Sequence, residues 1–260
     1  ETDAAAKTIA GYMRCMSSKL RNSGKGEQNA EMMVVSRIDG ALVIEDHGGW
    51  ALRNQSMTRM LRTLDASGSL LDFPPMVVQT GDRCIVKHTL NDGVELDLWQ
   101  SQPVPEELRA RLPLRRVLSM CTTPKYADVA VPDWCFDAWP EAGVEQGSFD
   151  KACAKLAEAG AQPPTKGDML SWCGTAHHHP SRLRLMELAK EHPALLACVN
   201  VVDKAVDKSA HLSMCEQAER YGLLLDVQGK GYSSRLKLLL HTGRAVFVAK
   251  RPWEEYFQQG

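Results

Sequence analysis

This chain has almost no excess of charge of either sign, no long apolar run and no paired-cysteine motif, and each absence excludes a class of protein. Its 31 Lys and Arg residues nearly balance its 32 Asp and Glu residues, which leaves a formal net charge of −1. A chain so close to neutral does not attract nucleic acid or an anionic membrane in general, so we expect no nucleic-acid partner. No apolar run approaches the roughly 20 residues of a spanning helix, so we expect no membrane span.

The eight cysteines are scattered, and none has a Cys-x-x-Cys or other zinc-binding spacing. Their even number is compatible with disulfides in a secretory compartment and equally with separate buried thiols. The first twenty residues show no apolar signal-peptide core, and the chain begins with Glu1. We therefore expect a trimmed chain or a fragment.

What remains is a series of short apolar runs that alternate with helix-like segments. A length of 260 residues suits one or two domains with a large core. Asp39-Gly40 and Asn91-Asp92-Gly93 are typical turn sequences and predict two hairpins. We expect strands at 32–38, 41–45, 76–79, 84–89, 94–98, 117–121, 169–172 and 196–202, and helices at 3–20, 54–64, 149–159 and 182–191.

Strands that alternate with helices predict an α/β fold with parallel sheets. The periodic pattern is weakest at 137–147, where we place a junction between two lobes. Periodicity alone does not distinguish two lobes from a single doubly wound domain.

The segment from Tyr221 to Phe257 carries the most informative pattern of the chain. An apolar run at 223–227 is followed by the turn Gln228-Gly229-Lys230-Gly231, a leucine-rich helix and a second apolar run at 245–249. This succession predicts a βαβ unit of a parallel sheet.

The turn of this unit suits an anion. Ser233 or Ser234 is suited to cap the helix, and Gly243 to end it. Two glycines allow a phosphate to approach the backbone, the helix N-terminus offers free N–H groups, and Arg235 adds a fork of donors. An ordinary βα turn has the same local pattern and stays open as the alternative.

Three groups of motifs follow one another in a recognisable order. Thr123-Pro124-Lys125-Tyr126-Ala127-Asp128 stands before Val131-Pro132-Asp133-Trp134, and Trp172-Cys173-Gly174-Thr175 before Pro180-Ser181-Arg182. Gly231-Tyr232-Ser233-Ser234-Arg235, Val246-Phe247-Val248 and Trp253-Glu254-Glu255-Tyr256-Phe257 complete the set. Together they resemble glycosyltransferase family 90, the capsule-associated, KDEL-containing, Rumi-type protein O-glucosyltransferases. The resemblance covers most of 33–257 and is closest from Val117 onward.

The resemblance implies two Rossmann-like lobes that face a cleft, the GT-B arrangement. It places an N-terminal lobe with acceptor site and base at 1–140, a connecting segment at 141–167 and a C-terminal nucleotide-sugar-binding lobe at 168–260. Family members continue beyond the last motif, so we expect the second lobe to be incomplete at its C-terminus.

The resemblance also implies an inverting glycosyltransferase that moves glucose or xylose from a UDP-sugar to a protein or glycan hydroxyl. The lumen of the endoplasmic reticulum or Golgi is the location that it implies. The chain has no Asp-x-Asp motif, which agrees with a metal-independent two-lobed transferase, so we expect no metal or other cofactor.

Asp82 is our candidate for the base that takes the proton from the acceptor hydroxyl. It follows the expected strand at 76–79, at the edge where open α/β sheets bind ligands. The family's base has the same place, although Gln79-Thr80-Gly81 differs from the family's Asn-x-Arg. A turn or helix-capping role is the alternative for Asp82, and Asp133 is the rival carboxylate.

We assign the donor diphosphate to two loops. One comprises Gly229, Lys230, Gly231, Tyr232, Ser233, Ser234 and Arg235, and the other Trp172, Cys173, Gly174 and Thr175. The family has an arginine at the position of Cys173, and the loss of such a contact to phosphate costs about 1.5–3 kcal/mol. Arg182, Arg184 or the run His177-His178-His179 are the candidates to compensate. A solvated loop is the alternative for the histidines.

Aromatic and acidic side chains complete the expected cleft. Trp134, Trp139 and Trp172 suit stacking on a sugar, with core packing as the alternative. Glu254 and Glu255 suit hydrogen bonds to sugar or ribose hydroxyls, with a surface role as the alternative.

Two further hypotheses stay open. In the first, the chain is a catalytically degenerate family member that acts as a glycan- or protein-binding module. Three features motivate this hypothesis. Cys173 replaces the family's arginine, the chain ends early at its C-terminus, and Glu219 and Thr242 stand where the family has a cysteine pair. In the second, an α/β enzyme binds another phosphorylated ligand at the same loop.

Overall fold

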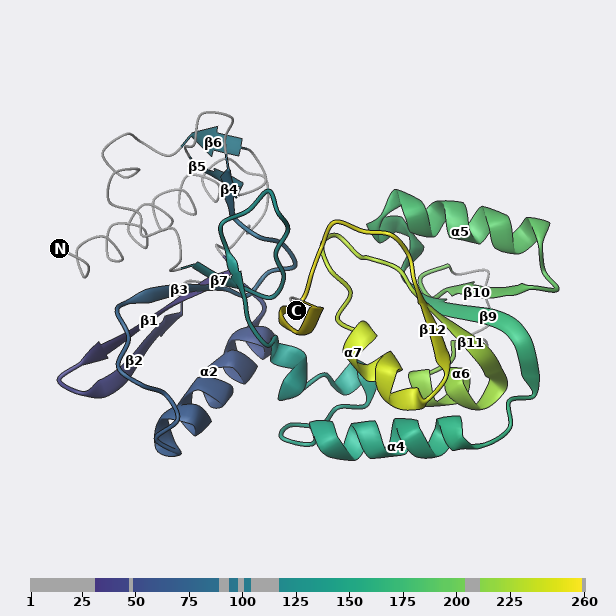
Figure 1. Ribbon diagram of the computed structural model, residues 1–260, viewed down its shortest axis with the longest axis horizontal. Helices are drawn as coiled ribbons and strands as arrows, with labels where there is room; N and C mark the ends of the chain where they lie inside the picture. The colour runs from purple at the N-terminus through teal and green to yellow at the C-terminus, as the bar shows by residue number, and fades with distance from the viewer. Residues whose placement is uncertain are drawn as a thin grey trace. The chain divides into compact units, whose positions relative to one another are not determined.

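The computed structural model of the protein describes residues 31–46, 49–88, 94–97, 101–103, 117–203 and 211–258. The chain divides into two compact units, Glu1–Asp137 with Pro252–Gly260, and Ala138–Arg251 (Figure 1). The lobe bounds expected above stay a prediction, and the expected helix at 3–20 lies outside the described residues. Within the described ranges, no helix combines the length and apolarity needed to cross a membrane.

The first unit contains a five-stranded mixed sheet in the order β2-β1-β3-β7-β8. The first hairpin is confirmed, because β1 and β2 pair antiparallel around Asp39 and Gly40. Their φ angles of 51° and 77° are those of a type I′ turn. The strand bounds are Met32–Ile38 for β1, Ala41–Asp46 for β2, Met76–Gln79 for β3, Val117–Ser119 for β7 and Val129–Ala130 for β8.

Only part of this sheet is parallel. Strand β1 is antiparallel to both of its neighbours, whereas β3, β7 and β8 run parallel. The parallel pairing expected of an α/β fold is therefore present for β3, β7 and β8, and the antiparallel pair of β1 and β2 is the predicted hairpin. The residues from Met32 to Val35 are all buried, as in a strand that is covered on both faces.

One helix and a small second sheet complete the first unit. Helix α2 (Ala51–Ala66) confirms the helix expected at 54–64 and buries Met57 and Leu61. Strands β4 (Val86–His88) and β5 (Val94–Asp97) form the second expected hairpin, and β6 (Ser101–Pro103) adds a strand that we did not predict.

The second unit contains a four-stranded sheet in the order β10-β9-β11-β12, and all its strands run parallel. This confirms both the parallel sheet and the βαβ unit expected around 221–249. The strand bounds are Lys166–Gly174 for β9, Leu196–Asn200 for β10, Tyr221–Asp226 for β11 and Ala245–Val248 for β12.

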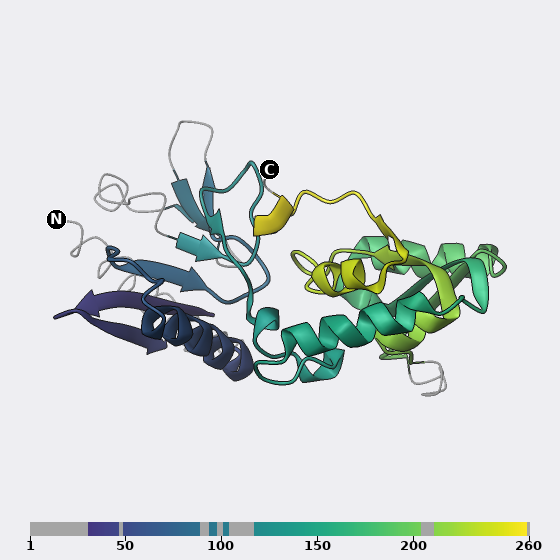
Figure 2. The same cartoon turned by 60° about the horizontal axis from the view of Figure 1, so that its bottom comes forward.

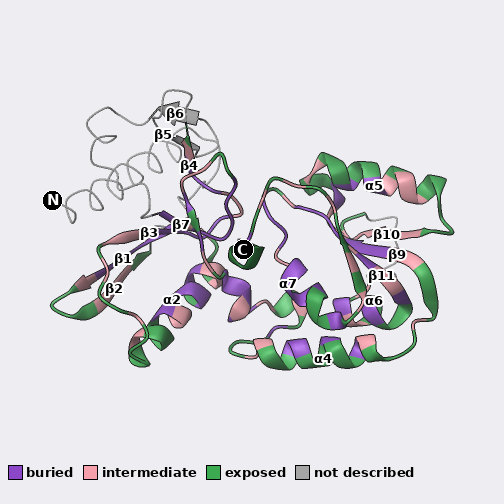
Figure 3. Cartoon of the chain, viewed as in Figure 1, coloured by how far each residue is buried: buried purple, intermediate pink, exposed green. Residues whose placement is uncertain are grey.

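Helices cover both faces of this sheet (Figures 1 and 2). On one face, α4 (Phe149–Ala161), α6 (Met214–Arg220) and α7 (Leu236–Leu239) pack around a core that contains Leu156, Leu224 and Leu238. On the other, α5 (Pro180–Glu191) packs on Trp172 and Val227 through Leu185. The buried residues of α4 recur along its length, as an amphipathic helix requires (Figure 3). Helices α4 and α5 were predicted, whereas α6 was missed.

Short 3₁₀ turns connect several of these elements. They are Trp134–Phe136, Pro140–Ala142, Ala176–His178, Leu240–Thr242 and Tyr256–Gln258.

Candidate active site

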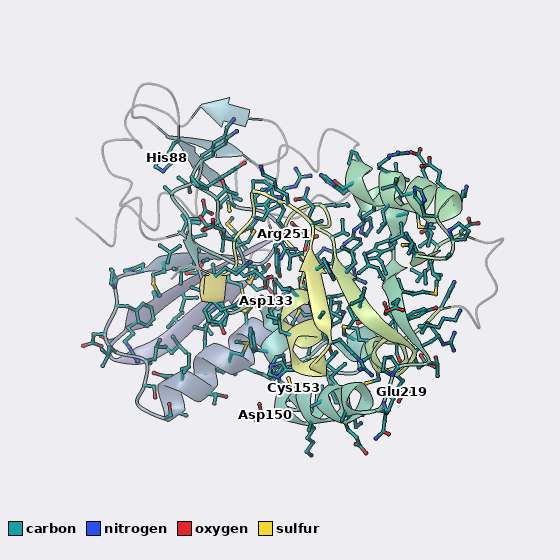
Figure 4. All side chains as sticks on the ribbon, turned by 45° about the vertical axis from the view of Figure 1, so that its right-hand side comes forward. His88, Asp133, Asp150, Cys153, Glu219 and Arg251 are labelled. Atoms are coloured by element: carbon teal, nitrogen blue, oxygen red, sulfur yellow. The ribbon has the colours of Figure 1, made fainter. Side chains whose placement is uncertain are left out.

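The carboxyl ends of the parallel strands in the second unit gather glycines and charged side chains at one edge of the sheet. Strand β9 ends at Gly174, β11 at Asp226 and β12 at Val248. Ligands of open α/β sheets bind at this edge. Figure 4 shows Arg251 a few residues beyond β12.

A buried carboxylate stands at the centre of this edge. Asp226 is fully buried, and its Oδ1 accepts a hydrogen bond of 2.5 Å from the hydroxyl of Ser233. Its Oδ2 pairs with the guanidinium of Arg251. The sequence analysis missed Asp226 and Arg251, although an acidic residue at the end of an apolar strand is a usable indication of a site.

Ser233 and Ser234 do not cap the following helix with their side chains, contrary to our prediction. The cap position is Arg235, whose side chain makes no capping hydrogen bond. The hydroxyl of Ser233 donates its hydrogen bond to Asp226 instead. Helix α7 has only four residues before it tightens into a 3₁₀ turn, which ends as predicted at Gly243 with φ 68°. Such a short helix gives little support to the expected anion site at a helix N-terminus.

Arg235 is partly buried. Its Nη1 donates to the carbonyl of Cys173, and its guanidinium lies 5.5 Å from the centre of the Trp172 ring. Its Nη2 is buried and has no hydrogen-bond partner within the described part of the chain. Burial lowers the pKa of Arg235 from its ordinary value, while the neighbouring charge of Asp226 acts in the opposite direction. A buried donor without an acceptor is costly, so a ligand that offers an acceptor to Nη2 would be favoured there.

The loop before Arg235 closes on itself. The N–H of Gly229 donates to the carbonyl of Tyr232 at 3.2 Å. Tyr232 and Ser233 are buried, whereas Lys230 is exposed. The structure thus brings the predicted Gly229–Arg235 loop and the end of β9 together at one edge.

Asp82 lies in the first unit, three residues after the end of β3, as predicted. Its Oδ1 lies 2.8 Å from Nη1 of Arg53, and 35% of its side chain is exposed. The guanidinium of Arg53 also lies 5.1 Å from the centre of the Trp134 ring. The next described element is the strand β4, so Asp82 caps no helix there. It is an accessible carboxylate that an arginine keeps in position.

Comparison with protein families identifies the chain. The description of the matching family is Glycosyl transferase family 90, and its model covers residues 60–260. The chain belongs to this family. A search among curated proteins found no match. Family membership makes the protein a glycosyltransferase, which takes a sugar from a nucleotide-sugar donor to an acceptor. The capsule-associated, KDEL-containing, Rumi-type subgroup stays a prediction.

Cys173 departs from the arginine that the resemblance implies at this position. Its side chain is buried, and burial raises the pKa of the thiol above its ordinary value. The thiol is therefore neutral at neutral pH and supplies no charge to a diphosphate.

Arg182 does not replace the missing charge at Cys173, because the backbone uses its guanidinium. Its Nε donates to the carbonyl of Gln228 at 2.8 Å and its Nη2 to that of Val227 at 2.8 Å. Its Nη1 donates to the carbonyl of Thr175 at 3.0 Å. Arg182 thus ties the end of β9 to the loop after β11.

Arg184 does not replace the charge either. It is exposed on α5 and pairs with Glu187 at 3.0 Å and Glu191 at 3.3 Å.

Trp172 is a core residue, so it is not available to stack on a sugar. Its side chain is 0% exposed and lies against the guanidinium groups of both Arg182 and Arg235. A Cβ at Gly174 would lie 3.0 Å from the Trp172 ring and 3.4 Å from Arg235, which explains the glycine. Trp134 is also buried, and Trp139 packs against the core of the second unit.

The three histidines have different surroundings. His177 and His178 are exposed, with ring centres 4.8 Å apart. Nδ1 of His179 accepts the N–H of Ser181 at 3.2 Å and caps α5. In the residues that the structure describes, no three His, Cys, Asp or Glu side chains are placed to bind a metal ion together.

The other three predicted carboxylates differ in their surroundings. Asp133 is buried and accepts the N–H of Cys135 at 3.1 Å, so it caps a 3₁₀ turn and is not suited as the rival base. The backbone of Glu254 pairs with that of Thr122, with two N···O distances of 2.8 Å. The side chain of Glu254 is exposed, whereas that of Glu255 is buried. Both glutamates belong to the first unit.

Proposed function

We propose that this family 90 glycosyltransferase moves glucose or xylose from a UDP-sugar to a hydroxyl of a protein or glycan. The reaction inverts the anomeric carbon and needs no metal ion. The observation that supports the donor half is Arg235, whose buried Nη2 has no acceptor within the described residues.

Arg235 has the properties of a diphosphate ligand. Charge-assisted hydrogen bonds from a guanidinium to phosphate oxygens are short and strong. The carbonyl of Cys173 and the ring of Trp172 fix the orientation of this guanidinium before any ligand binds. A preorganised positive charge stabilises a leaving diphosphate without reorganisation during the reaction.

Asp82 takes the role of the base in this proposal. As the acceptor oxygen attacks the anomeric carbon, the carboxylate removes its proton, and the bond from that carbon to the UDP oxygen breaks. A single displacement of this kind inverts the anomeric carbon. Arg53 keeps one carboxylate oxygen in position, which supports this assignment.

By resemblance, we propose the lumen of the endoplasmic reticulum or Golgi as the location.

Isothermal titration of the full chain with UDP in the presence of EDTA tests the donor half. We expect saturable UDP binding, weaker binding of UMP and none of uridine, because the diphosphate carries the contact. Release of glucose or xylose from the corresponding UDP-sugar then identifies the donor. No detectable binding at millimolar UDP would overturn the proposal.

One observation favours a second function, that of a degenerate member that binds a glycan or protein. The position of the expected family arginine holds the neutral, buried Cys173, and neither Arg182 nor Arg184 replaces its charge. The substitution Cys173→Arg separates the two functions. If it creates UDP-sugar hydrolysis that the natural chain lacks, the natural chain is degenerate. Family membership disfavours the hypothesis of an unrelated phosphorylated ligand.

A further inference from the structure

Two buried thiols of the first unit lie against one another. The thiol of Cys84 donates to the carbonyl of Cys121 at 3.0 Å, so it reaches the backbone of the second cysteine. The thiol of Cys121 lies 3.7 Å from the carbonyl oxygen of Asp82. Both cysteines are almost fully buried, with exposed fractions of 1% and 0%.

The topology of the sheet explains why these cysteines meet. Strands β3 and β7 are parallel neighbours, with Val78 opposite Leu118. Cys84 and Cys121 both follow the carboxyl ends of these strands, so they lie at the same edge. Neighbouring strands are about 4.8 Å apart, and the Cα atoms of a disulfide are usually about 4.4–6.8 Å apart.

We propose that Cys84 and Cys121 form a disulfide bond when the protein folds in the presence of a disulfide oxidant such as oxidised glutathione. The bond joins the loop that carries Asp82 to the segment that follows β7. This inference is independent of the proposed sugar donor.

The exchange has two steps. The thiolate of one cysteine attacks a sulfur of oxidised glutathione, forms a mixed disulfide and releases one glutathione thiolate. The thiolate of the second cysteine then attacks the protein sulfur of the mixed disulfide and releases the second glutathione. The two cysteines lose two protons and two electrons, and one molecule of oxidised glutathione becomes two thiols.

The burial of the pair indicates that the bond forms during folding. The hydrogen bond with Cys121 and burial raise the pKa of the Cys84 thiol far above its ordinary value. Because the thiolate is the reactive form, a buried pair exchanges slowly once the protein has folded. The same burial protects a completed bond from reductants.

Peptide mapping of the full chain tests the bond. The protein is refolded in a glutathione redox buffer, unfolded again in guanidinium that contains N-ethylmaleimide so that buried free thiols are also alkylated, and digested without reduction. We expect one linked peptide pair that contains Cys84 and Cys121, lighter by two hydrogens than the sum of the two peptides and separated by dithiothreitol. N-ethylmaleimide on both cysteines, or a bond from either to another cysteine, would overturn the proposal.

Thermal unfolding gives an independent measurement. The bond links residues 37 positions apart, and a loop of this length restricts the unfolded chain. We expect the oxidised protein to have a Tm several degrees above that of the reduced protein. Cys84→Ala and Cys121→Ala should each abolish this difference, whereas Cys153→Ala, in the core of the second unit, should keep it. An identical Tm in both redox states would contradict the bond, even if a cysteine variant fails to fold.

Discussion

Arg251 and Asp226 form an ion pair from which water is almost completely excluded, with exposed fractions of 3% and 0% for the two side chains. Removal of one partner leaves a buried charge without compensation, which typically costs about 3–5 kcal/mol. We expect Asp226→Asn and Arg251→Met each to lower the free energy of unfolding by about this amount. The double variant should lose less than the sum of the single variants, because it leaves no unpaired charge.

Urea unfolding of the three variants measures this coupling. Arg184→Met is the matched control, because this arginine forms exposed pairs on α5 and its loss should leave the free energy of unfolding unchanged. Strictly additive single effects would show that the two side chains do not act as a pair.

Arg235→Ala should weaken UDP binding by about 1.5–3 kcal/mol, since it removes a charge-assisted contact to phosphate. The side chain also packs on Trp172, so we expect the free energy of unfolding to fall as well. The substitution of a fully exposed arginine would leave it unchanged. Calorimetry gives the affinity and thermal unfolding the stability. Arg184→Ala should change neither. Unaltered UDP affinity in a folded Arg235→Ala variant would exclude the phosphate role.

Asp82→Asn should abolish sugar transfer and preserve UDP affinity, because an amide cannot accept the proton of the acceptor hydroxyl. The measurement is the transfer rate at saturating UDP-sugar together with a UDP titration. Asp72→Asn is the control, since the side chain of Asp72 is fully exposed. Sugar transfer by the Asp82→Asn variant at the rate of the natural protein would assign the base to another residue.

Gly222→Ala should lower the free energy of unfolding by about 1–3 kcal/mol, the usual cost of an overpacked site. A Cβ at Gly222 would lie 2.1 Å from the carbonyl oxygen of Gly167, where the register of β11 against β9 shifts. Gly167→Ala is the control on the opposite strand, because its nearest neighbour would be 3.9 Å away. Chemical denaturation compares the two, and equal stability of both variants would contradict the close approach.

Stability should fall as the pH falls through about 6.5 toward the lowered pKa of His179. Burial, and then the charge of Arg182, lower this pKa, so the folded state favours the neutral ring. The unfolded state takes up a proton first and gains stability relative to the folded state. His179→Asn, a good helix cap that does not titrate, should reduce this pH dependence. Urea midpoints at pH 5.5 and 7.5 measure it, and an unchanged slope would contradict the assignment.

Local chemistry made part of the fold predictable. The hairpin at Asp39-Gly40 follows from two residues that tolerate positive φ, and the parallel strands of the second unit follow from apolar runs between turns. Helix α6 was missed although Ser213 and Glu216 form a capping box that the sequence displays. Its seven residues are too few to show the hydrophobic periodicity of a helix clearly.

The candidate site was less predictable, because its contacts join distant residues. Ser233 was expected to cap a helix, but Asp226, seven positions earlier, accepts its hydroxyl. Arg182 was expected near a ligand, but carbonyls 45 and 46 positions away accept its donors. Only the folded backbone shows which charged side chains bind other parts of the protein, and that Nη2 of Arg235 has no acceptor among the residues that the structure describes.

The pairing of Glu254 with Thr122 makes the first unit discontinuous in sequence, while Ala138–Arg251 forms an uninterrupted insertion within it. The chain therefore passes between the units twice, after Asp137 and after Arg251. A single protease cut at either passage would leave both units joined through the other. Because Arg251 is the last residue of the insertion, the second passage begins at the buried ion pair with Asp226, which anchors that end of the insertion.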